Sequence, residues 1–330
     1  MQVPWRAVTV HLSVVTVCMN RQMHLTETAP RVQAWADALG LAWEHVVVDW
    51  NSTVPLIRES LPASGSLRLI RVQGEQEWCA ARAYNFACAQ AKGELLMRLD
   101  ADCWPERLTA EQLEQLSAGD VLEGALAGGS EGSWLMHRQL FEDVGGFHEL
   151  LRGYGCEDID LRARLKLRGA RINTLSPEAI RVIRHESDLR VGLVLGNMSR
   201  SAAAIARAWK DALVEANRWA VVQHPWSVHR PHTGYRQCSG GPWTSIAATV
   251  PQPPAALDQQ LQRIRRQRFW SRFLLLSPSV LDQLPQSWFG GFDGRGFGVR
   301  RWHRFYWHTG RRLVLLLHQL LIHFCRRVGG

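Results

Sequence analysis

Four apolar runs within the first hundred residues alternate with helical patterns, and this alternation restricts the fold more than any other feature of the chain. The runs are rich in Val, Leu and Ile, which is typical of strands buried in a parallel sheet. They are LSVVTVCM (12–19), HVVVDW (45–50), RLIRV (68–72) and ELLMRLD (94–100). One helical stretch between them follows Thr28–Pro30 and ends at Gly40, and another spans residues 78–94. The pattern predicts an α/β fold, with a mostly parallel mixed sheet flanked by helices.

The rest of the chain predicts shorter elements. Helices are expected near 109–117, at 157–170 and at 202–220, with short strands at RINTL and RVIRH. PQPP (251–254) predicts a linker ahead of the last quarter of the chain.

That last quarter holds all of the excess positive charge. Residues 251–330 contain 13 Arg, no Lys and 3 Asp, a balance of +10, whereas the whole chain has a net charge of +9. Arg interleaved with Trp and Phe indicates an anionic partner, such as lipid headgroups, phosphorylated carriers or nucleic acid. Residues 263–276 and 300–327 combine Arg with apolar runs. We expect them either to lie in a membrane interface or to pack on the rest of the protein.

The cysteines and the hydropathy pattern predict a cytoplasmic protein. The seven Cys are scattered without a Cys-x-x-Cys pair, which argues against a disulfide framework and against a zinc site. We expect no signal peptide, because no small-residue cleavage site follows the first apolar segment. The longest apolar stretch, residues 313–324, is interrupted by His318, Gln319 and His323. It is shorter than the about 17–25 residues that a membrane span needs.

Polar side chains follow two of the predicted strands. Asp49 and Asn51 come at the end of the second strand, and Asp100 and Asp102 at the end of the fourth. The carboxyl ends of parallel strands meet at one edge of a sheet, where ligands bind. Carboxylate oxygens suit Mg²⁺ or Mn²⁺, which keep open positions for phosphate oxygens. A solvated turn or a helix N-cap would also explain an Asp-x-Asp pair, but the convergence of four such side chains favours a metal site.

GYGCEDIDL (153–161) follows VGGF (144–147) in the second half of the predicted domain. Together with VVTVCMNR, VVVDWNS, ARAYN, DAD and IRH, in that order, these motifs resemble family 2 glycosyltransferases and the galactosyltransferase family. The resemblance covers roughly residues 10–190 and implies an inverting, metal-dependent enzyme with a GT-A fold. We expect this catalytic domain over 8–195, a helical continuation over 196–250 and a basic, largely helical extension over 251–330.

The resemblance implies that Asp158 is the catalytic base and that Glu157 holds the acceptor or orients the loop. An inverting transfer needs a carboxylate that takes the proton of the acceptor hydroxyl as its oxygen attacks the anomeric carbon. The alternative is that Glu157, Asp158 and Asp160 only favour a helix N-terminus.

The resemblance also implies the remaining contacts of the site. Asp100 and Asp102 would hold Mn²⁺ or Mg²⁺ against the donor diphosphate, with His185 as a third ligand or as an ordinary structural His. Donor contacts would come from Asp49, Asn51, Arg82 and Asn85, although Arg82 is equally typical of a helix surface.

Two tryptophans complete the prediction. Trp134, with the Gly128-Gly129 pair, would line the sugar or acceptor pocket. Trp50 would either stack on the nucleotide base or pack beneath its loop.

These inferences predict a hexosyl- or hexosaminyltransferase that uses a nucleoside diphosphate sugar, which we expect to be a UDP-sugar. The acceptor would be a hydroxyl of a glycan or a lipid-linked glycan in polysaccharide or cell-envelope assembly, with no nucleic-acid partner. One alternative is a nucleotidyltransferase that makes the sugar nucleotide, although MNRQMHL lacks the Gly-rich nucleotide loop of that class. The other is a non-catalytic protein that binds anionic ligands or membranes through the basic extension.

Overall fold

The computed structural model describes residues 11–153, 155–183 and 200–264, together with Leu313, Leu316, Leu317 and Leu320. For residues 200–209 and 211 it describes the backbone alone. The chain forms two compact units. The first comprises Met1–Gly153, Glu157–Glu186 and Trp226–Gln252, and the second comprises Tyr154–Cys156, Ser187–Pro225 and Pro253–Gly330.

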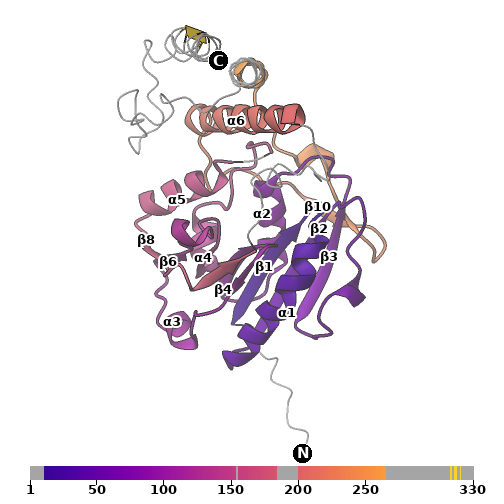
Figure 1. Ribbon diagram of the computed structural model, residues 1–330, viewed down its shortest axis with the longest axis vertical. Helices are drawn as coiled ribbons and strands as arrows, with labels where there is room; N and C mark the ends of the chain where they lie inside the picture. Colours follow the sequence, from indigo (N-terminus) through magenta and orange to yellow (C-terminus); the bar gives the residue numbers. More distant parts are fainter. Residues whose placement is uncertain are drawn as a thin grey trace, which may run out of the picture. The chain divides into compact units, whose positions relative to one another are not determined.

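The first unit is built on a nine-stranded sheet with the order β10-β11-β3-β2-β1-β4-β7-β6-β8 (Figure 1). The strands are β1 (Leu12–Cys18), β2 (Trp43–Trp50), β3 (Leu67–Gln73), β4 (Leu95–Asp100), β6 (Asp120–Glu123), β7 (Trp134–His137), β8 (Arg171–Thr174), β10 (Tyr235–Gln237) and β11 (Trp243–Ser245). The four apolar runs of the sequence form β1 to β4, which pair in parallel, whereas β7 is antiparallel to β4 and to β6. A separate antiparallel pair joins β5 (Cys103–Pro105) to β9 (Ile180–Val182). The predicted mixed, mostly parallel sheet is confirmed.

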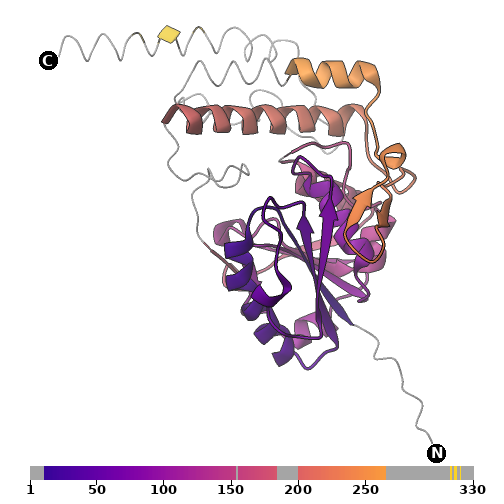
Figure 2. The same cartoon turned by 90° about the vertical axis from the view of Figure 1, so that its right-hand side faces the viewer.

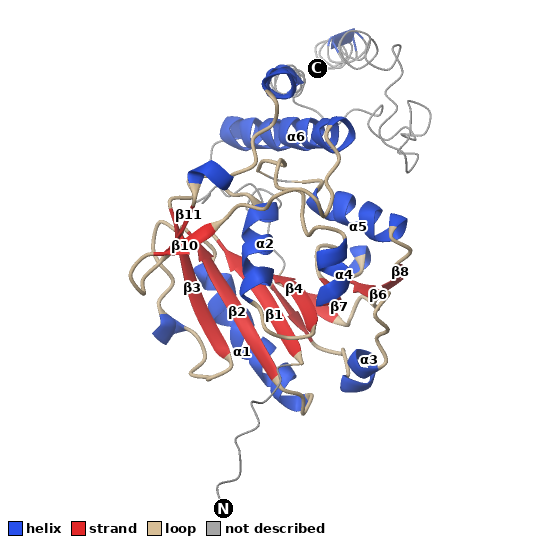
Figure 3. Cartoon of the chain, turned by 180° about the vertical axis from the view of Figure 1, so that it is seen from behind, coloured by secondary structure: helices blue, strands red, loops and turns tan. Residues whose placement is uncertain are grey.

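Helices cover both faces of this sheet, α1 (Gln22–Ala38) on one and α2 (Ala80–Gln90) on the other (Figures 1 and 3). Successive side chains of a strand point to opposite faces, so β1 contributes Leu12 and Val14 to the core under α1, and Val15 and Val17 to the core under α2. These four side chains are at most 3% exposed, which explains why β1 is mostly apolar.

Further helices follow along the chain. They are α3 (Ala110–Glu114), α4 (Arg138–Asp143), α5 (Glu157–Leu167) and, in the second unit, α6 (Arg200–Gln223). The helix predicted near 109–117 begins with a capping box of Thr109 and Gln112. None of the helices in the described ranges is long and apolar enough to cross a membrane.

Two predicted elements differ from the structure. The first helix begins at Gln22, before Thr28, and contains Pro30. Leu25, Ala29 and Val32 are at most 1% exposed on either side of that proline, so burial of a continuous apolar face outweighs the lost backbone hydrogen bond.

The second difference lies in the segment expected to continue as helix to residue 250. Residues 226–252 belong to the first unit, and β10 and β11 extend its sheet by pairing beside β3. Figure 2 shows this hairpin in orange beside the purple strands. Three-residue strands carry too little periodicity to be recognised in the sequence.

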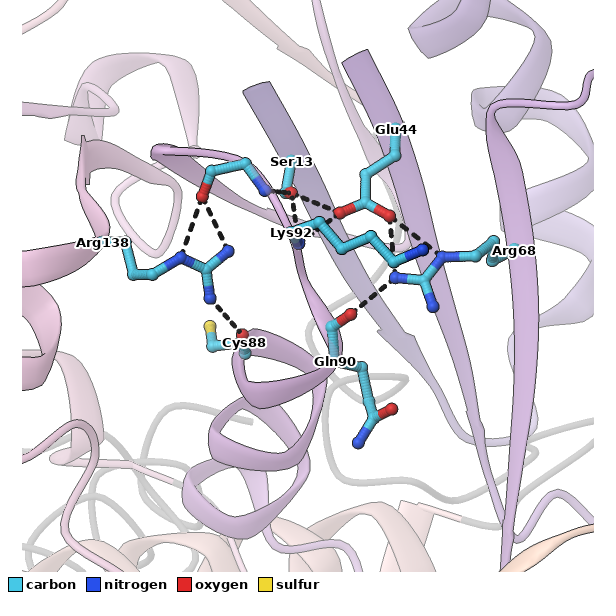
Figure 4. A network of polar contacts seen from close by, with 8 residues as sticks. Ser13, Glu44, Arg68, Cys88, Gln90, Lys92 and Arg138 are labelled. Atoms are coloured by element: carbon cyan, nitrogen blue, oxygen red, sulfur yellow. Dashed lines mark hydrogen bonds and ion pairs between the residues drawn. The ribbon is translucent and has the colours of Figure 1, made fainter. Parts of the chain in front are cut away.

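A buried carboxylate ties the strands together near the amino ends of β1 and β2 (Figure 4). Glu44, 5% exposed, accepts hydrogen bonds from Ser13 Oγ at 2.7 Å and from Arg68 Nε at 2.9 Å. Ser13 Oγ accepts a further bond from Gly93 N at 2.7 Å. This polar network fixes the chain between α2 and β4, and a Cβ at Gly93 would come within 2.6 Å of Ser13 N.

We expect Glu44→Gln to lower the free energy of unfolding by about 2 kcal/mol, because Arg68 loses its charged partner while Ser13 keeps an acceptor. Urea denaturation measures the change, with the exposed Glu114→Gln as the control that should leave the midpoint unchanged. Equal midpoints for the two variants would show that this network does not stabilise the sheet.

Candidate active site

The predicted site residues of β2 and β4 lie at the carboxyl edge of the parallel strands. β1 lies between the two strands, with Cys18 paired to Asp49 and Val17 paired to Asp100. Asp49 and Asp100 therefore lie at the same edge of the sheet. Because Val17 and Cys18 are consecutive residues of β1, the two acidic side chains point to opposite faces. Because α5 begins at Glu157, its first turn is the other source of carboxylates.

Arg98, which the sequence analysis did not single out, joins the two sources. It is 3% exposed and lies on β4 two residues before Asp100, so both side chains point to the same face. Its Nη1 donates to Asp158 Oδ1 and, at 2.6 Å, to Gly132 O, while its Nη2 donates to Asp100 Oδ1 at 3.2 Å. The guanidinium lies over the Tyr84 ring, 4.2 Å from its centroid. Burial lowers the pKa of Arg98, but Asp158 and Asp100 together raise it well above its ordinary value.

Asp158 differs from the other acids of its helix turn. Asp160 is 4% exposed and pairs within the helix with Arg164 at 2.7 Å, as an acid that only supports the helix would. The Asp158 side chain is 34% exposed and is held by Arg98 of β4 instead. Burial raises the pKa of Asp158 to about 8, and Glu157 and Asp100 add to the rise against the opposing effect of Arg98.

Asp100 and Asp102 offer two carboxylates at the strand end. The Asp100 side chain is 46% exposed, and its Oδ1 accepts a 2.8 Å bond from the Tyr84 hydroxyl. Asp102 Oδ1 accepts a 3.4 Å bond from Cys103 Sγ. Burial lowers the pKa of Arg21, and the nearby Asp102 opposes that shift. Arg21 is the last residue of the VVTVCMNR motif, and its cation near Asp102 is a second feature that the sequence did not single out.

Asp100 and Asp102 supply part of the ligand set that a hard divalent cation requires. Two carboxylates separated by one residue supply oxygen ligands, and the 46% exposed side chain of Asp100 can reach a ligand. Within the described ranges no group of three or more His, Cys, Asp or Glu side chains could by itself hold a metal ion. The predicted third ligand, His185, lies outside the described residues.

Family models match the part of the chain that contains this site. Residues 13–153 match glycosyl transferase family 2, and residues 126–186 match the N-terminal domain of galactosyltransferase. Residues 13–153 carry a glycosyltransferase family 2 domain. The resemblance to these two families is therefore confirmed, and so is the prediction of a glycosyltransferase, while the role of the GYGCEDIDL motif stays a prediction.

Solved structures similar to the chain include two glycosyltransferases. A mutant of the Drosophila β1,4-galactosyltransferase 7 in complex with manganese, UDP-Gal and xylobiose has 13% sequence identity and a TM-score of 0.44, over 72% of this chain and 93% of that chain. The mannosyltransferase PcManGT from Pyrobaculum calidifontis, in complex with GDP-Man and Mn²⁺, has 15% identity and a TM-score of 0.45, over 97% of this chain and 91% of that chain. No curated protein matches the chain significantly in sequence.

In the glycosyltransferase domain, Asp49 and Asn51 are engaged with neighbouring backbone. Asp49 is 1% exposed, accepts 3.0 Å bonds from Ser52 N and Leu56 N, and pairs with Arg71. Asn51 adopts φ +53° and donates to Glu75 O at 2.7 Å. Both residues therefore shape the loop after β2, and their contact with a nucleotide stays a prediction.

Trp50 packs beneath this loop, as one of its two expected roles requires. It is fully buried, with its ring centroid 5.9 Å from that of Tyr235 and 6.4 Å from that of Phe86. Stacking on a nucleotide base would need an exposed ring, so the structure excludes the other role for this conformation.

Arg82 and Asn85 of α2 are also engaged within the domain. Arg82 Nη2 lies 2.8 Å from Glu75 Oε2, and its side chain is 12% exposed, so it is not an ordinary helix-surface residue. Asn85 is 6% exposed and donates to Phe147 O at 2.9 Å and to Glu149 Oε1 at 2.8 Å. The structure therefore gives Asn85 the task of holding the VGGFHE segment against α2.

Trp134 lies beneath the site rather than at its surface. Its side chain is buried and stacks on Phe141 with ring centroids 5.3 Å apart. The glycine that approaches the carboxylates is Gly132 rather than Gly128 or Gly129. A Cβ there would lie 3.3 Å from Asp100 Oδ2 and 3.5 Å from Asp158 Oδ2.

Proposed function

We propose that this protein transfers a sugar from a nucleoside diphosphate sugar to a hydroxyl group with inversion at the anomeric carbon. The observation that carries the proposal is that Asp158 and Asp100 bind the same guanidinium, that of Arg98. A candidate base thus lies beside the Asp-x-Asp pair, as a displacement between an acceptor and a leaving diphosphate requires.

Each carboxylate then has a distinct task. Asp158 accepts the proton of the acceptor hydroxyl at one of its carboxylate oxygens as that hydroxyl attacks. Its raised pKa suits this task, because a more basic carboxylate takes a proton more readily once it is ionised. Glu157, 8% exposed at the start of α5, orients the acceptor or its loop.

Asp100 and Asp102, with His185 as a third ligand, would hold Mn²⁺ or Mg²⁺. When bound there, the cation would neutralise charge on the departing diphosphate. Both similar structures contain a sugar nucleotide and manganese, which supports this choice of cofactor and of donor class. We propose that the donor is a UDP-sugar, and that Asp49, Asn51, Arg82, Asn85 and Trp134 shape its site.

The anomeric configuration of the product tests the inverting mechanism. Proton NMR of the fresh product should show the anomeric configuration opposite to that of the donor sugar, because one displacement inverts the carbon. A product with the donor's configuration would contradict the role of Asp158 as a base.

We propose further that the basic extension binds an anionic membrane surface. Four leucines, each 53–58% exposed, recur at the spacing i, i+3, i+4 and i+7 of one helix face: Leu313, Leu316, Leu317 and Leu320. In the sequence, Arg pairs at 311–312 and 326–327 flank them. An apolar helix face with flanking Arg is typical of helices that lie in a membrane interface.

Sedimentation with vesicles tests this association. The wild-type protein should sediment with phosphatidylglycerol vesicles and lose most of this binding with phosphatidylcholine vesicles, because the Arg side chains need anionic headgroups. Leu316→Asp should weaken binding, whereas Leu126→Asp, at a leucine that is 76% exposed in the first unit, should not. Equal binding by both variants would place the membrane contact elsewhere or exclude it.

A further inference from the structure

Arg98 is a buried charged residue within the apolar strand β4, and its presence there requires a physical explanation. Leu95, Leu96, Met97 and Leu99 around it on β4 are fully buried, and the Arg98 side chain is only 4% exposed. Removing a guanidinium from water is costly unless its donors find partners. A stabilising role alone would be served as well by an apolar residue at this position, as it is at every other interior position of β4.

The partners of Arg98 come from three separate segments that the site must align. Asp100 follows it on β4, Gly132 O comes from the turn before β7, and Asp158 comes from α5. The planar guanidinium presents its donors in a fixed fork, so it sets the positions of all three acceptors at once. The rings of Tyr84 and Phe147, 4.2 and 5.5 Å from the guanidinium carbon, fix its plane.

Arg98 binds only one oxygen of each carboxylate. It donates to Oδ1 of Asp158 and to Oδ1 of Asp100. The Oδ2 atoms of both residues lie beside Gly132, within 3.5 Å of the point where a Cβ would stand. The guanidinium of Arg98 therefore turns the other oxygen of each acid toward a shared space beside Gly132, which a Cβ at this position would narrow.

We propose that Arg98 is a positioning residue for the transfer. It holds the Asp158 and Asp100 carboxylates in a fixed orientation, with the Oδ2 atoms of both facing the space beside Gly132. The inference rests on the proposed function, since it assigns Arg98 to the base and to a metal carboxylate of that reaction.

Arg98→Lys tests the proposal, because it keeps the buried positive charge but cannot donate to three acceptors in a fixed fork. We expect kcat for transfer to fall about 10²-fold, while KM for the donor changes by less than about threefold. Mn²⁺ affinity, measured by the EPR signal of free Mn²⁺ without any substrate, should stay within about threefold, because Tyr84 still holds Asp100. Arg68→Lys is the control: Arg68 is also a strand Arg that pairs with a buried carboxylate, Glu44, but it lies outside the site, and kcat should not change.

Three results would overturn the inference. One is a kcat of Arg98→Lys equal to that of the wild type. Another is loss of Mn²⁺ binding and of thermal stability in parallel with kcat, which would make Arg98 a residue of the fold alone. Gly132→Ala provides a second variant that keeps Arg98 and its bonds: its Cβ enters the space between the Oδ2 atoms, and an unchanged kcat there would also contradict the proposal. If the wild-type protein releases no nucleoside diphosphate from any donor, it is the proposed function that fails, and the two failures are thus distinguishable.

Discussion

Asp158→Asn is expected to lower kcat for sugar transfer by about 10²–10⁴-fold, because the amide cannot accept the proton of the acceptor hydroxyl. The substitution preserves shape, and the amide oxygen can still accept a hydrogen bond from Arg98, so the carboxylate's surroundings should persist. Nucleotide binding, measured by calorimetry with a nucleoside diphosphate and Mn²⁺, should remain largely intact. Turnover close to that of the wild type would remove Asp158 from the mechanism.

Asp160→Asn is the matched control, since Asp160 is an acid of the same first turn of α5 that pairs with an Arg. If the acids of this turn only favoured a helix N-terminus, both variants would lose stability and neither would lose kcat selectively. We expect Asp160→Asn to reduce stability through its lost pairing with Arg164 and to leave kcat unchanged.

The profile of kcat/KM against pH adds a second comparison. Because only ionised Asp158 acts as a base and burial raises its pKa to about 8, wild-type kcat/KM should decline as the pH falls through that region. The Asp158→Asn variant should lack this decline.

The second large effect is expected from Asp102→Asn, which should lower metal-dependent turnover by about 10²–10³-fold. An amide is a weaker ligand for a hard cation than a carboxylate, so the Mn²⁺ concentration for half-maximal activity should rise. Asp102 is a cleaner target than Asp100, because Tyr84 and Arg98 both bind Asp100 and would be disturbed with it.

The exposed Glu114→Gln, which removes one negative charge on α3 outside the proposed site, controls for the change in net charge. Titration of Mn²⁺ in the presence of a nucleoside diphosphate, followed by the shift in melting temperature, gives a readout that is independent of turnover. Identical Mn²⁺ titrations for Asp102→Asn and the wild type would exclude this residue as a ligand.

The sequence was sufficient to predict β1 to β4 and the acidic groups at their carboxyl ends. Both depend on local pattern: continuous apolar runs indicate buried strands, and the direction of parallel strands places Asp49 and Asp100 at one edge. Helix α3 was likewise predictable, because a Thr–Gln capping box is encoded within four residues.

The function of Arg98 could not be predicted, because its partners Gly132 and Asp158 lie 34 and 60 residues away in the sequence. The same holds for Asn85, whose amide bonds a segment 62 residues away. An Arg within an otherwise apolar strand was the one local signal, since a buried charge requires partners. The start of α1 and the strands β10 and β11 were missed for a similar reason: tertiary burial, rather than local propensity, decides them.

Release of nucleoside diphosphate from a panel of UDP- and GDP-sugars, with Mn²⁺ and with EDTA, tests the central claim most directly. We predict that at least one donor, expected to be a UDP-sugar, is hydrolysed slowly to the free sugar and the nucleoside diphosphate, and that EDTA abolishes this release. The rate should persist in protein that lacks residues 255–330, because the site residues of the described domain all precede them. Release of pyrophosphate in place of nucleoside diphosphate, or release from no donor at all, would contradict the assignment of this site to sugar transfer.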